Sequence, residues 1–223
     1  MILAIDCSAN LCAACVYDAV AGRELGRSVL DLGKGHAEHL IAVIDAALAA
    51  AGKAYSDLRA IAVSVGPGSF TGIRVAVSAA RGFALALNIP AIGVNTLEAL
   101  AAEVREAGSA KPVLAVLTSG LENVQLGVYD EFGSVAYAPE IMTVRVAAEL
   151  ASNTKAVLAG TAARHISELS GLPVASEKAT ADIGVYARVA FAKGADGGKP
   201  SPLYLREPDA KPQAGFVLPR RQS

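Results

Sequence analysis

The chain has 223 residues, 53% of them hydrophobic and 18% charged, a composition that can bury a large core and excludes an intrinsically disordered protein. Lys and Arg number 20 against 21 Asp and Glu, so the sequence lacks the basic excess expected of a domain that binds RNA by itself. Asp45 and Arg81 interrupt the longest apolar stretches, and the strand-like start does not resemble a signal peptide, which predicts a cytoplasmic protein with no membrane span.

The first half of the chain predicts three meandering strands, a helix, a further strand and a second helix. In chain order these elements are expected at residues 2–6, 12–17, 25–32, 36–51, 61–65 and 71–87. Leu40, Ile44 and Leu48 form one stripe of the first helix, and Gly52 ends it. The second helix is apolar or small nearly all round, so we expect it to be buried on two sides, against the sheet and against another helix of this chain or of a partner.

The second half of the chain repeats the first. Residues 113–116 (Val-Leu-Ala-Val) repeat residues 2–5 (Ile-Leu-Ala-Ile), and the tripeptide Val-Tyr-Asp at 128–130 repeats that at 16–18. Further helices and strands are expected at 144–151, 156–159, from 161 onward and at 180–193. Chance similarity between β-branched strands is the alternative, but the shared order of elements favours an internal duplication.

A duplicated unit of three strands, a helix and a strand is the plan of the actin-like ATPase fold, an α/β fold of two ribonuclease H-like lobes that face each other across a cleft. We therefore expect two lobes, of which the second is reduced. The expected division is 1–108 for an N-terminal lobe that carries interface helices, 109–210 for a degenerate C-terminal lobe and 211–223 for a disordered tail.

The hairpin turns are the places where active members of this fold bind phosphate, through an acid, a glycine and a hydroxyl group. The first turn has Asp6 and Ser8 but no glycine, and the second has Ser119 and Gly120 but no matching carboxylate. These four residues are the candidates for residual nucleotide binding. Neither turn by itself predicts a complete phosphate site.

A glycine-rich loop at 66–74 (Gly-Pro-Gly-Ser-Phe-Thr-Gly-Ile-Arg) follows a strand and opens a helix, the context in which such loops bind anions. Its spacing fits neither the dinucleotide-binding fingerprint nor the P-loop. The favoured interpretation is a tight turn in which Ser69 or Thr71 caps the helix.

The cysteines and histidines do not predict a metal site. Cys7, Cys12 and Cys15 are an odd number with no second Cys or His pair, so we expect reduced thiols packed in strands. His36 and His39 lie one helical turn apart without a third ligand, which favours a solvated first turn of a helix. No residue of the chain is assigned a catalytic role.

The glycine-rich loop and the strand before it, residues 58–64, are similar to the most specific stretch of the bacterial TsaB family, also called YeaZ. Weaker matches are Ile-Asp-Cys-Ser at 5–8, His-Ala-Glu-His at 36–39 and Pro-Leu-Tyr-Leu-Arg at 202–206, so the resemblance covers nearly the whole chain. The second hairpin departs from the family, because many members have Asp-Ala-Arg where this chain has Thr-Ser-Gly at 118–120.

The resemblance implies an accessory, non-catalytic scaffold subunit that binds TsaD, a protein of similar fold that holds the metal and the active site. TsaD forms N6-threonylcarbamoyladenosine (t6A) beside the anticodon of tRNAs that read codons beginning with A. The complex uses ATP and includes the ATPase TsaE, and tRNA would meet this chain only through the complex. The chain alone could form a homodimer, and no cofactor is assigned to it.

Members of the family pair through helices of the N-terminal half, which implies an interface on the two helices predicted there. The residues assigned to this interface are His36, Leu40, Phe70, Ile73, Arg74 and Val77. Val77→Glu is expected to abolish partner binding while the monomer stays folded. The alternative is an enzyme that acts alone, a phosphotransferase of the actin-like superfamily or an M22-like metallopeptidase, for which the sequence supplies neither phosphate loops nor a full ligand set.

Overall fold

The computed structural model describes residues 1–194 and 199–205, so the tail predicted at 211–223 lies outside the described residues. The strands are β1 (Ile2–Asp6), β2 (Leu11–Asp18), β3 (Arg23–Asp31), β4 (Ala60–Gly66), β5 (Ala91–Asn95), β6 (Val113–Ser119), β7 (Asn123–Tyr129), β8 (Val135–Thr143), β9 (Val157–Ala159) and β10 (Val174–Ser176). The helices are α1 (His36–Ala51), α2 (Phe70–Leu87), α3 (Thr96–Glu106), α4 (Val144–Thr154), α5 (Ala163–Ser170) and α6 (Ile183–Lys193), with a short 3₁₀ helix η1 (Tyr55–Asp57).

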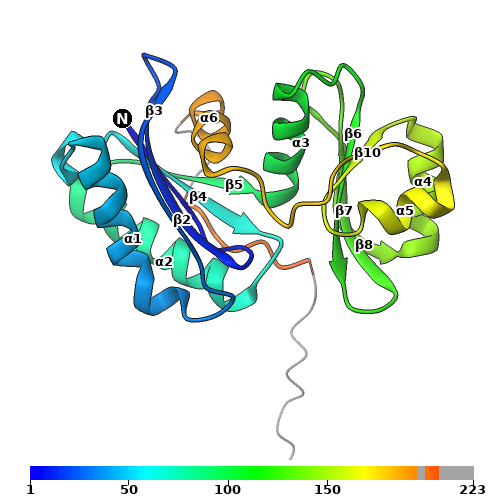
Figure 1. Ribbon diagram of the computed structural model, residues 1–223, viewed down its shortest axis with the longest axis horizontal. Coiled ribbons are helices and arrows are strands. Elements are labelled where there is room, and N and C mark those ends of the chain that lie inside the picture. Colours follow the sequence, from blue (N-terminus) through cyan, green and yellow to red (C-terminus); the bar gives the residue numbers. More distant parts are fainter. Residues whose placement is uncertain (195–198, 206–223) are drawn as a thin grey trace, which may run out of the picture.

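Each of the two lobes is built on one five-stranded mixed sheet (Figure 1). The first sheet has the order β3-β2-β1-β4-β5 and the second the equivalent order β8-β7-β6-β9-β10. In the first sheet β1, β2 and β3 pair antiparallel, and β4 and β5 run parallel to β1. In the second sheet β6, β7 and β8 pair antiparallel, and β9 and β10 run parallel to β6. This shared topology confirms the actin-like α/β fold. The second lobe keeps all five strands, but β9 and β10 have only three residues each.

The register of the hairpins confirms the internal duplication residue by residue. Leu3 pairs with Val16 in the first lobe, and Leu114 pairs with Val128 in the second. These are the residues that the repeated sequence motifs place in equivalent positions. Because shifting the register by one residue would turn every side chain to the other face, the two hairpins have kept the same inward and outward pattern.

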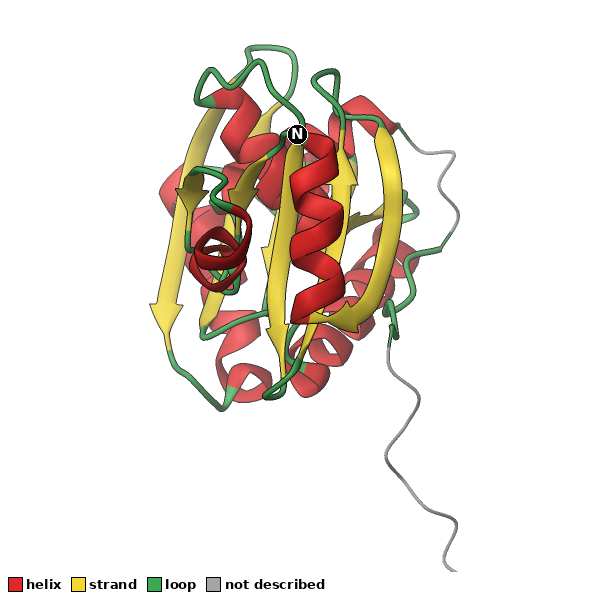
Figure 2. Ribbon diagram, turned by 90° about the vertical axis from the view of Figure 1, so that its right-hand side faces the viewer, coloured by secondary structure: helices red, strands yellow, loops and turns green. Residues whose placement is uncertain are grey.

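Helices lie on both faces of each sheet, and α3 and α6 lie between the lobes (Figure 1). On the outer face of the first sheet, α1 and α2 pack against β1 and β4 through one apolar cluster. On its inner face α6 buries Ile183 and Tyr186, while α3 contributes Leu97 and Leu100 to the core of the second lobe. Figure 2, turned so that the second lobe faces the viewer, shows strands side by side with helices packed against them. α3 and α6 therefore lie between the cores of the two lobes.

The chain returns to the first lobe after completing the second. α6 follows β10 in sequence, but its apolar residues pack with those of β1, β2 and β5. The predicted division of the chain between residues 108 and 109 stays a prediction. α6 lies in the second half of the chain, but by its packing it belongs to the first lobe.

The helix α2 is long and apolar enough to cross a membrane, judged by length and composition alone, with a hydropathy of 1.3 over Phe70–Leu87. Arg81 therefore does not exclude α2 by this criterion, and the absence of a membrane span stays a prediction. Core helices of soluble proteins pass the same test. Here Ile73, Ala76 and Val77 bury one side of α2 against the first sheet, which explains why its residues are so apolar.

Most predicted elements are present within a few residues of their expected bounds. α6 begins at Ile183 and not at 180, because Asp182 is the residue whose side chain caps the helix. β5, α3 and β10 are absent from the elements predicted from the sequence. For α3 the signal was present, since Asn95 and Glu98 form a capping box at its start.

Candidate functional site

A cleft of about 920 Å³ opens between the lobes. Its lining includes residues 8–10 of the first hairpin turn, 67–70 of the glycine-rich loop, 117–119 at the end of β6 and 202–205 of the C-terminal segment. The carboxyl ends of the parallel strands β1, β4 and β5 lie at one edge of the first sheet, which is where open α/β sheets usually bind ligands. The cleft is therefore the place where a ligand would be expected from the topology.

Asp6, the acid at the end of β1, is turned into the protein interior. Its side chain is only 1% exposed and is not part of the cleft wall. The backbone N–H of Ser8 donates to Oδ1 at 2.8 Å, and the hydroxyl group of Thr180 donates to Oδ2 at 2.7 Å. Both carboxylate oxygens are thus engaged by the protein itself.

A buried polar cluster surrounds Asp6. The hydroxyl oxygens of Thr180 and Tyr186 lie 2.6 Å apart, and Tyr186 is fully buried. Burial and the neighbouring Asp6 raise the pKa of Tyr186 well above its ordinary value, so its hydroxyl group keeps its proton. Among the described residues, the buried hydroxyl groups of Ser64 and Thr96 have no hydrogen-bond partner. The cluster thus links the end of β1 to the segment before α6 and to α6 itself.

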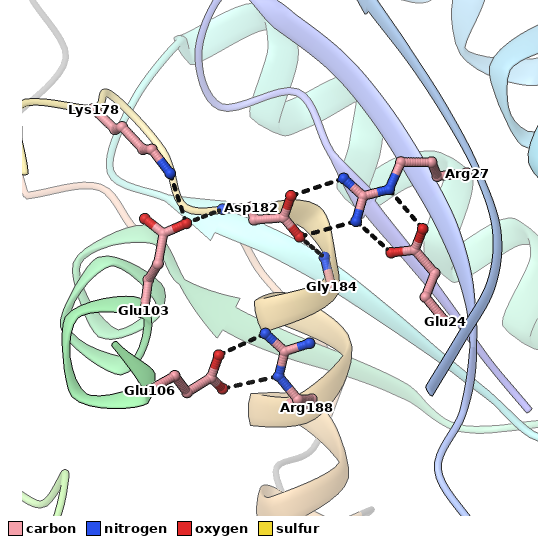
Figure 3. Close-up of polar contacts among 8 residues, drawn as sticks. All are labelled: Glu24, Arg27, Glu103, Glu106, Lys178, Asp182, Gly184 and Arg188. Atoms are coloured by element: carbon pink, nitrogen blue, oxygen red, sulfur yellow. Dashed lines mark hydrogen bonds and ion pairs between the residues drawn. The ribbon is translucent and has the colours of Figure 1, made fainter. Parts of the chain in front are cut away.

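Polar contacts hold α6 in place on both sides (Figure 3). Arg27 of β3 donates to the Asp182 carboxylate at 2.8 Å, and that carboxylate accepts the Gly184 N–H at 2.9 Å as the cap of the helix. On the other side Arg188 donates to Glu106 of α3 at 2.9 Å. Partly exposed ion pairs of this kind contribute little stability singly, so their main effect here is to fix where α6 lies.

The glycine-rich loop contacts the first hairpin turn and does not form an open phosphate cradle. A Cβ atom at Gly68 would lie 2.2 Å from the Ser8 carbonyl oxygen, and one at Gly72 would lie 2.0 Å from the Cys7 carbonyl oxygen. The N–H of Ser69 donates to the Ser8 carbonyl oxygen at 2.7 Å, and its hydroxyl oxygen caps α2 by accepting from Gly72. The predicted tight turn with Ser69 as helix cap is confirmed. The glycines allow close approach of protein backbone, because no side chain would fit there.

The four candidate nucleotide-binding residues are not brought together on one wall. Ser8 and Ser119 line the cleft from opposite lobes, whereas Asp6 and Gly120 do not line it. Gly120 is exposed at the tip of the second hairpin with φ at +83°. A nucleotide role for these residues stays a prediction.

The residues assigned to the partner interface fall into two groups. His36, Leu40, Ile73 and Val77 are buried in the core of the first lobe, with at most 5% of each exposed, so they present no surface to a partner in this structure. Phe70 is 55% exposed, and Arg74 is also exposed. The helical phase was therefore wrong for the buried four, because α1 and α2 turn these side chains toward the sheet.

His36 also corrects the expected solvated first turn of α1. Its ring atom Nε2 lies 3.0 Å from the carbonyl oxygen of Ala9, and the residue is buried. His39, one turn later, is exposed as expected. His36 is thus a buried structural residue and His39 is a solvated one, so the two histidines do not act as a pair.

The cysteines are free and buried, as predicted. Cys7 and Cys12 lie on the α1 and α2 side of the first sheet with their sulfur atoms 3.8 Å apart, whereas Cys15 lies on the α6 side. Burial raises the pKa of Cys15 to about 12, so this thiol stays protonated. Within residues 1–194 and 199–205, no group of three His, Cys, Asp or Glu side chains could hold a metal ion.

Arg74, Phe70 and Tyr204 form an exposed group at the mouth of the cleft. The guanidinium carbon of Arg74 lies 3.7 Å from the centre of the Phe70 ring, and Nε donates to the Tyr204 hydroxyl oxygen at 2.7 Å. The N–H of Leu203 donates to the Val65 carbonyl oxygen at 2.8 Å, which fixes the segment that carries Tyr204. This hydrogen bond docks the C-terminal segment against the end of β4.

Thr180 and Tyr186 are the site residues that sequence reasoning did not identify. No local pattern marks them, because Thr180 contacts Asp6 from 174 positions away in the sequence and Tyr186 contacts Thr180. In the sequence, Tyr204 stands out only as part of the Pro-Leu-Tyr-Leu-Arg motif at 202–206. Its partner Arg74 lies 130 residues earlier in the sequence.

Comparisons with known proteins agree with one another. The model of the family "TsaD: tRNA N6-adenosine threonylcarbamoyltransferase" matches residues 31–183. An uncharacterized protein of Mycobacterium tuberculosis is 34% identical over 194 residues, which is 85% of this chain and 84% of that protein. The tRNA threonylcarbamoyladenosine biosynthesis protein TsaB of Buchnera aphidicola is 33% identical over 129 residues, or 58% of this chain and 60% of that protein.

A solved structure gives the same result for the fold. The structure of YeaZ from Pseudomonas aeruginosa superimposes with a TM-score of 0.76 at 27% sequence identity, covering 92% of this chain and 99% of that one. The likeness thus extends over both lobes, including the second lobe, whose hairpin departs from the family pattern at residues 118–120.

Proposed function

This chain belongs to the TsaD family and resembles its TsaB (YeaZ) members, and on that premise we propose that it is an accessory subunit in the biosynthesis of t6A in tRNA. Its role is to bind TsaD as a scaffold, in a cytoplasmic complex that also contains TsaE. In that complex TsaD carries out the transfer of the threonylcarbamoyl group, and tRNA reaches this chain only indirectly.

The observation that carries this proposal is that the Asp6 carboxylate is buried and hydrogen-bonded within the protein. In an actin-like enzyme the acid at the end of the first strand has to face the cleft to act on a phosphate or its metal ion. Here Ser8 and Thr180 occupy both carboxylate oxygens, and the residue is 1% exposed. An acid held in this way supports the lobe instead of the chemistry of a bound nucleotide.

The residues of the first hairpin do not fit a nucleotide and its metal ion bound by this chain alone. Phosphate binding would require the backbone of the glycine-rich loop to be open, but Gly68 and Gly72 are packed against residues 7 and 8. ATP and the metal ion used by the complex are therefore assigned to its other subunits.

The surface that would meet TsaD is formed by the exposed sides of α1 and α2. Ile41 is 49% exposed on α1 and Leu85 is 85% exposed on α2, and both are large apolar residues. Exposed apolar side chains on adjacent helices are typical of an interaction surface. The same surface would explain a homodimer of the isolated chain.

The experiment that tests this function uses the chain, TsaD and TsaE of the same organism. Light scattering after size-exclusion chromatography should show a complex of this chain with TsaD, and t6A formation on tRNA should require both proteins. Ordinary t6A formation by TsaD and TsaE without this chain would overturn the proposal. ATP hydrolysis or peptide cleavage by the purified chain alone would favour the enzyme alternative instead.

A further inference from the structure

Cys7 and Cys12 lie opposite each other in the first hairpin. The pairing of β1 with β2 ends with Asp6 opposite Ala13, and the same register continued by one step brings Cys7 opposite Cys12. Both side chains belong to the apolar cluster on the α1 and α2 side of the sheet, and their sulfur atoms are 3.8 Å apart. The hairpin therefore holds two thiols in contact, and the proposed function makes no use of them.

The positions of the two residues suit a disulfide. A disulfide joins residues whose Cα atoms are about 4.4–6.8 Å apart, and residues directly opposite in an antiparallel pair are about 4.5–5.5 Å apart. Because the S–S bond is about 2.05 Å long, the sulfur atoms have to approach by about 1.8 Å. Rotation of the two side chains supplies such a movement without a change of strand register.

The third cysteine is kept away from this pair by the pleat of the sheet. Cys15 follows Cys12 by three residues on the same strand, and successive side chains of a strand point to opposite faces. It therefore lies on the α6 side of the sheet, where it is as deeply buried as the other two. Cys15 thus provides an internal control, a thiol of equal burial on the other face.

The two paired thiols differ in acidity. The Cys7 thiol donates a hydrogen bond to the Cys12 sulfur atom, which lowers the pKa of Cys12 and outweighs burial and the nearby Asp6 carboxylate, both of which act to raise it. The same hydrogen bond, together with burial, raises the pKa of Cys7. Cys12 is therefore the thiol that loses its proton first, and the thiolate is the form that reacts with oxidants.

The turn that joins β1 to β2 covers the thiols. Cys7 and Cys12 are buried, whereas Ala9 and Leu11 are half-buried and Asn10 is exposed. Residues 8–10 also line the cleft, so only a short turn separates the sulfur atoms from solvent. Local opening of a turn admits a small neutral oxidant more readily than a bulky one such as oxidised glutathione.

We propose that Cys7 and Cys12 are a redox-active pair that hydrogen peroxide, or another small hydroperoxide, converts into an intramolecular disulfide. The Cys12 thiolate attacks a peroxide oxygen, the O–O bond breaks, and the departing hydroxide takes up the proton that Cys12 lost and becomes water. Cys7 then attacks the sulfur atom of the Cys12 sulfenic acid, and its proton leaves with the hydroxyl group as a second water. Two thiols are thus oxidised, one peroxide is reduced to two waters, and a thiol reductant restores the pair.

The disulfide would form beneath a contact that shapes the cleft. The carbonyl oxygen of Ser8, between the two cysteines in sequence, accepts the Ser69 N–H of the glycine-rich loop at 2.7 Å. Disulfides of intracellular proteins are usually transient and redox-sensing, which fits a reversible bond at this place. The inference does not depend on the proposed function, because it concerns the chain alone.

The test treats the folded full chain with hydrogen peroxide, removes the peroxide with catalase, unfolds the protein and alkylates the remaining thiols. Mass spectrometry then counts the alkyl groups on the tryptic peptide 1–23, which contains all three cysteines. Cys7→Ala and Cys12→Ala each remove one member of the pair, and Cys15→Ala is the matched control. Circular dichroism checks that each variant is folded, and a parallel sample is oxidised in urea.

The oxidised wild type should have lost two hydrogen atoms and carry one alkyl group, on Cys15, and dithiothreitol should restore all three thiols. Cys15→Ala should form the disulfide at the wild-type rate. Cys7→Ala should form none and should instead accumulate a Cys12 sulfenic acid that dimedone traps.

Three alkylated cysteines after peroxide treatment of the folded chain would overturn the inference, and so would a disulfide that includes Cys15. Oxidation in urea should lose the preference for pairing Cys7 with Cys12. An equal preference in urea would also count against the inference, because the pairing would then follow from sequence spacing and not from the hairpin.

Discussion

The hydroxyl group of Thr180 donates a 2.7 Å hydrogen bond to the carboxylate of Asp6, a residue 174 positions away in the sequence. Asp6 ends the first strand of the protein, and Thr180 lies in the segment that leaves the second lobe. The bond therefore joins the beginning of the first lobe to the point where the chain returns to it. A buried carboxylate requires such a donor, because water cannot reach it.

Thr180→Val should lower the free energy of unfolding by about 1–3 kcal/mol, since it leaves one oxygen of a buried carboxylate without its donor. Urea denaturation followed by circular dichroism measures this value. Thr71→Val, at an exposed position near the start of α2, is the matched control and should change stability by less than about 0.5 kcal/mol. Equal stability of the two variants would show that the Asp6 contact is not needed.

Gly72→Ala should destabilise the protein by about 3 kcal/mol or more, because the new methyl group would lie 2.0 Å from the carbonyl oxygen of Cys7. Gly82→Ala, ten residues later on the exposed side of the same helix, has no atom within 4 Å and should stabilise the protein by up to about 1 kcal/mol. Thermal unfolding distinguishes the two. A tolerated Gly72→Ala would mean that the loop does not pack on the hairpin turn as described.

Asp182→Asn should make stability less dependent on acid pH. Burial acts to raise the pKa of Asp182, but the Arg27 guanidinium and the Gly184 N–H outweigh it and hold the pKa below its ordinary value of 3.8. A lowered carboxyl pKa contributes stability above the ordinary value, and this contribution is lost as the pH falls through the lower value of the folded state. Urea denaturation at a series of pH values below 3.8 should therefore show a shallower decline for the variant.

Glu131→Gln, at an exposed carboxylate in the turn before β8, is the control for this pH series and should decline like the wild type. If Asp182→Asn declines as steeply as these two proteins, the Arg27 contact does not contribute to acid sensitivity.

Leu85→Ala should weaken the complex with TsaD by about 1 kcal/mol or more while leaving the isolated chain stable, because Leu85 is 85% exposed at the end of α2. Leu169→Ala, at a 55% exposed leucine on α5 of the second lobe, should affect neither property. Calorimetric titration and thermal unfolding measure the two quantities. Equal binding by Leu85→Ala and the wild type would place the interface elsewhere.

The expected effect of Val77→Glu has to be corrected. Val77 is 2% exposed and packs in the core of the first lobe, so a glutamate there would bury a charge and unfold the lobe. Loss of binding by this variant would not distinguish an interface from a damaged core.

Much of the fold could be predicted because each lobe carries strong local signals. The stripe of Leu40, Ile44 and Leu48 predicts α1, and the repeated strand motifs predict the duplication. α2 shows where such signals fail. A helix that is apolar nearly all round has no evident phase, so the sheet decides that Ile73 and Val77 are buried and Leu85 is not.

The candidate site was less predictable because it is formed by contacts between distant segments. The sequence identified Asp6 and Ser8 as residues of interest, but what they do depends on Thr180 and Tyr186. No periodicity or spacing links residue 6 to residue 180. The same holds for Arg74 and Tyr204, whose contact gives the exposed arginine its fixed orientation.

The return of α6 to the first lobe has a consequence for synthesis on the ribosome. The inner face of the first sheet is complete as a sheet once β5 ends at Asn95, but its apolar cover includes Ile183, Tyr186 and Ala190 of α6. At about 5–20 residues per second, translation of the intervening chain takes roughly 5–20 s. During that time the apolar face lacks its cover and is open to chaperones. The lobe that is made first is thus the one that is finished last.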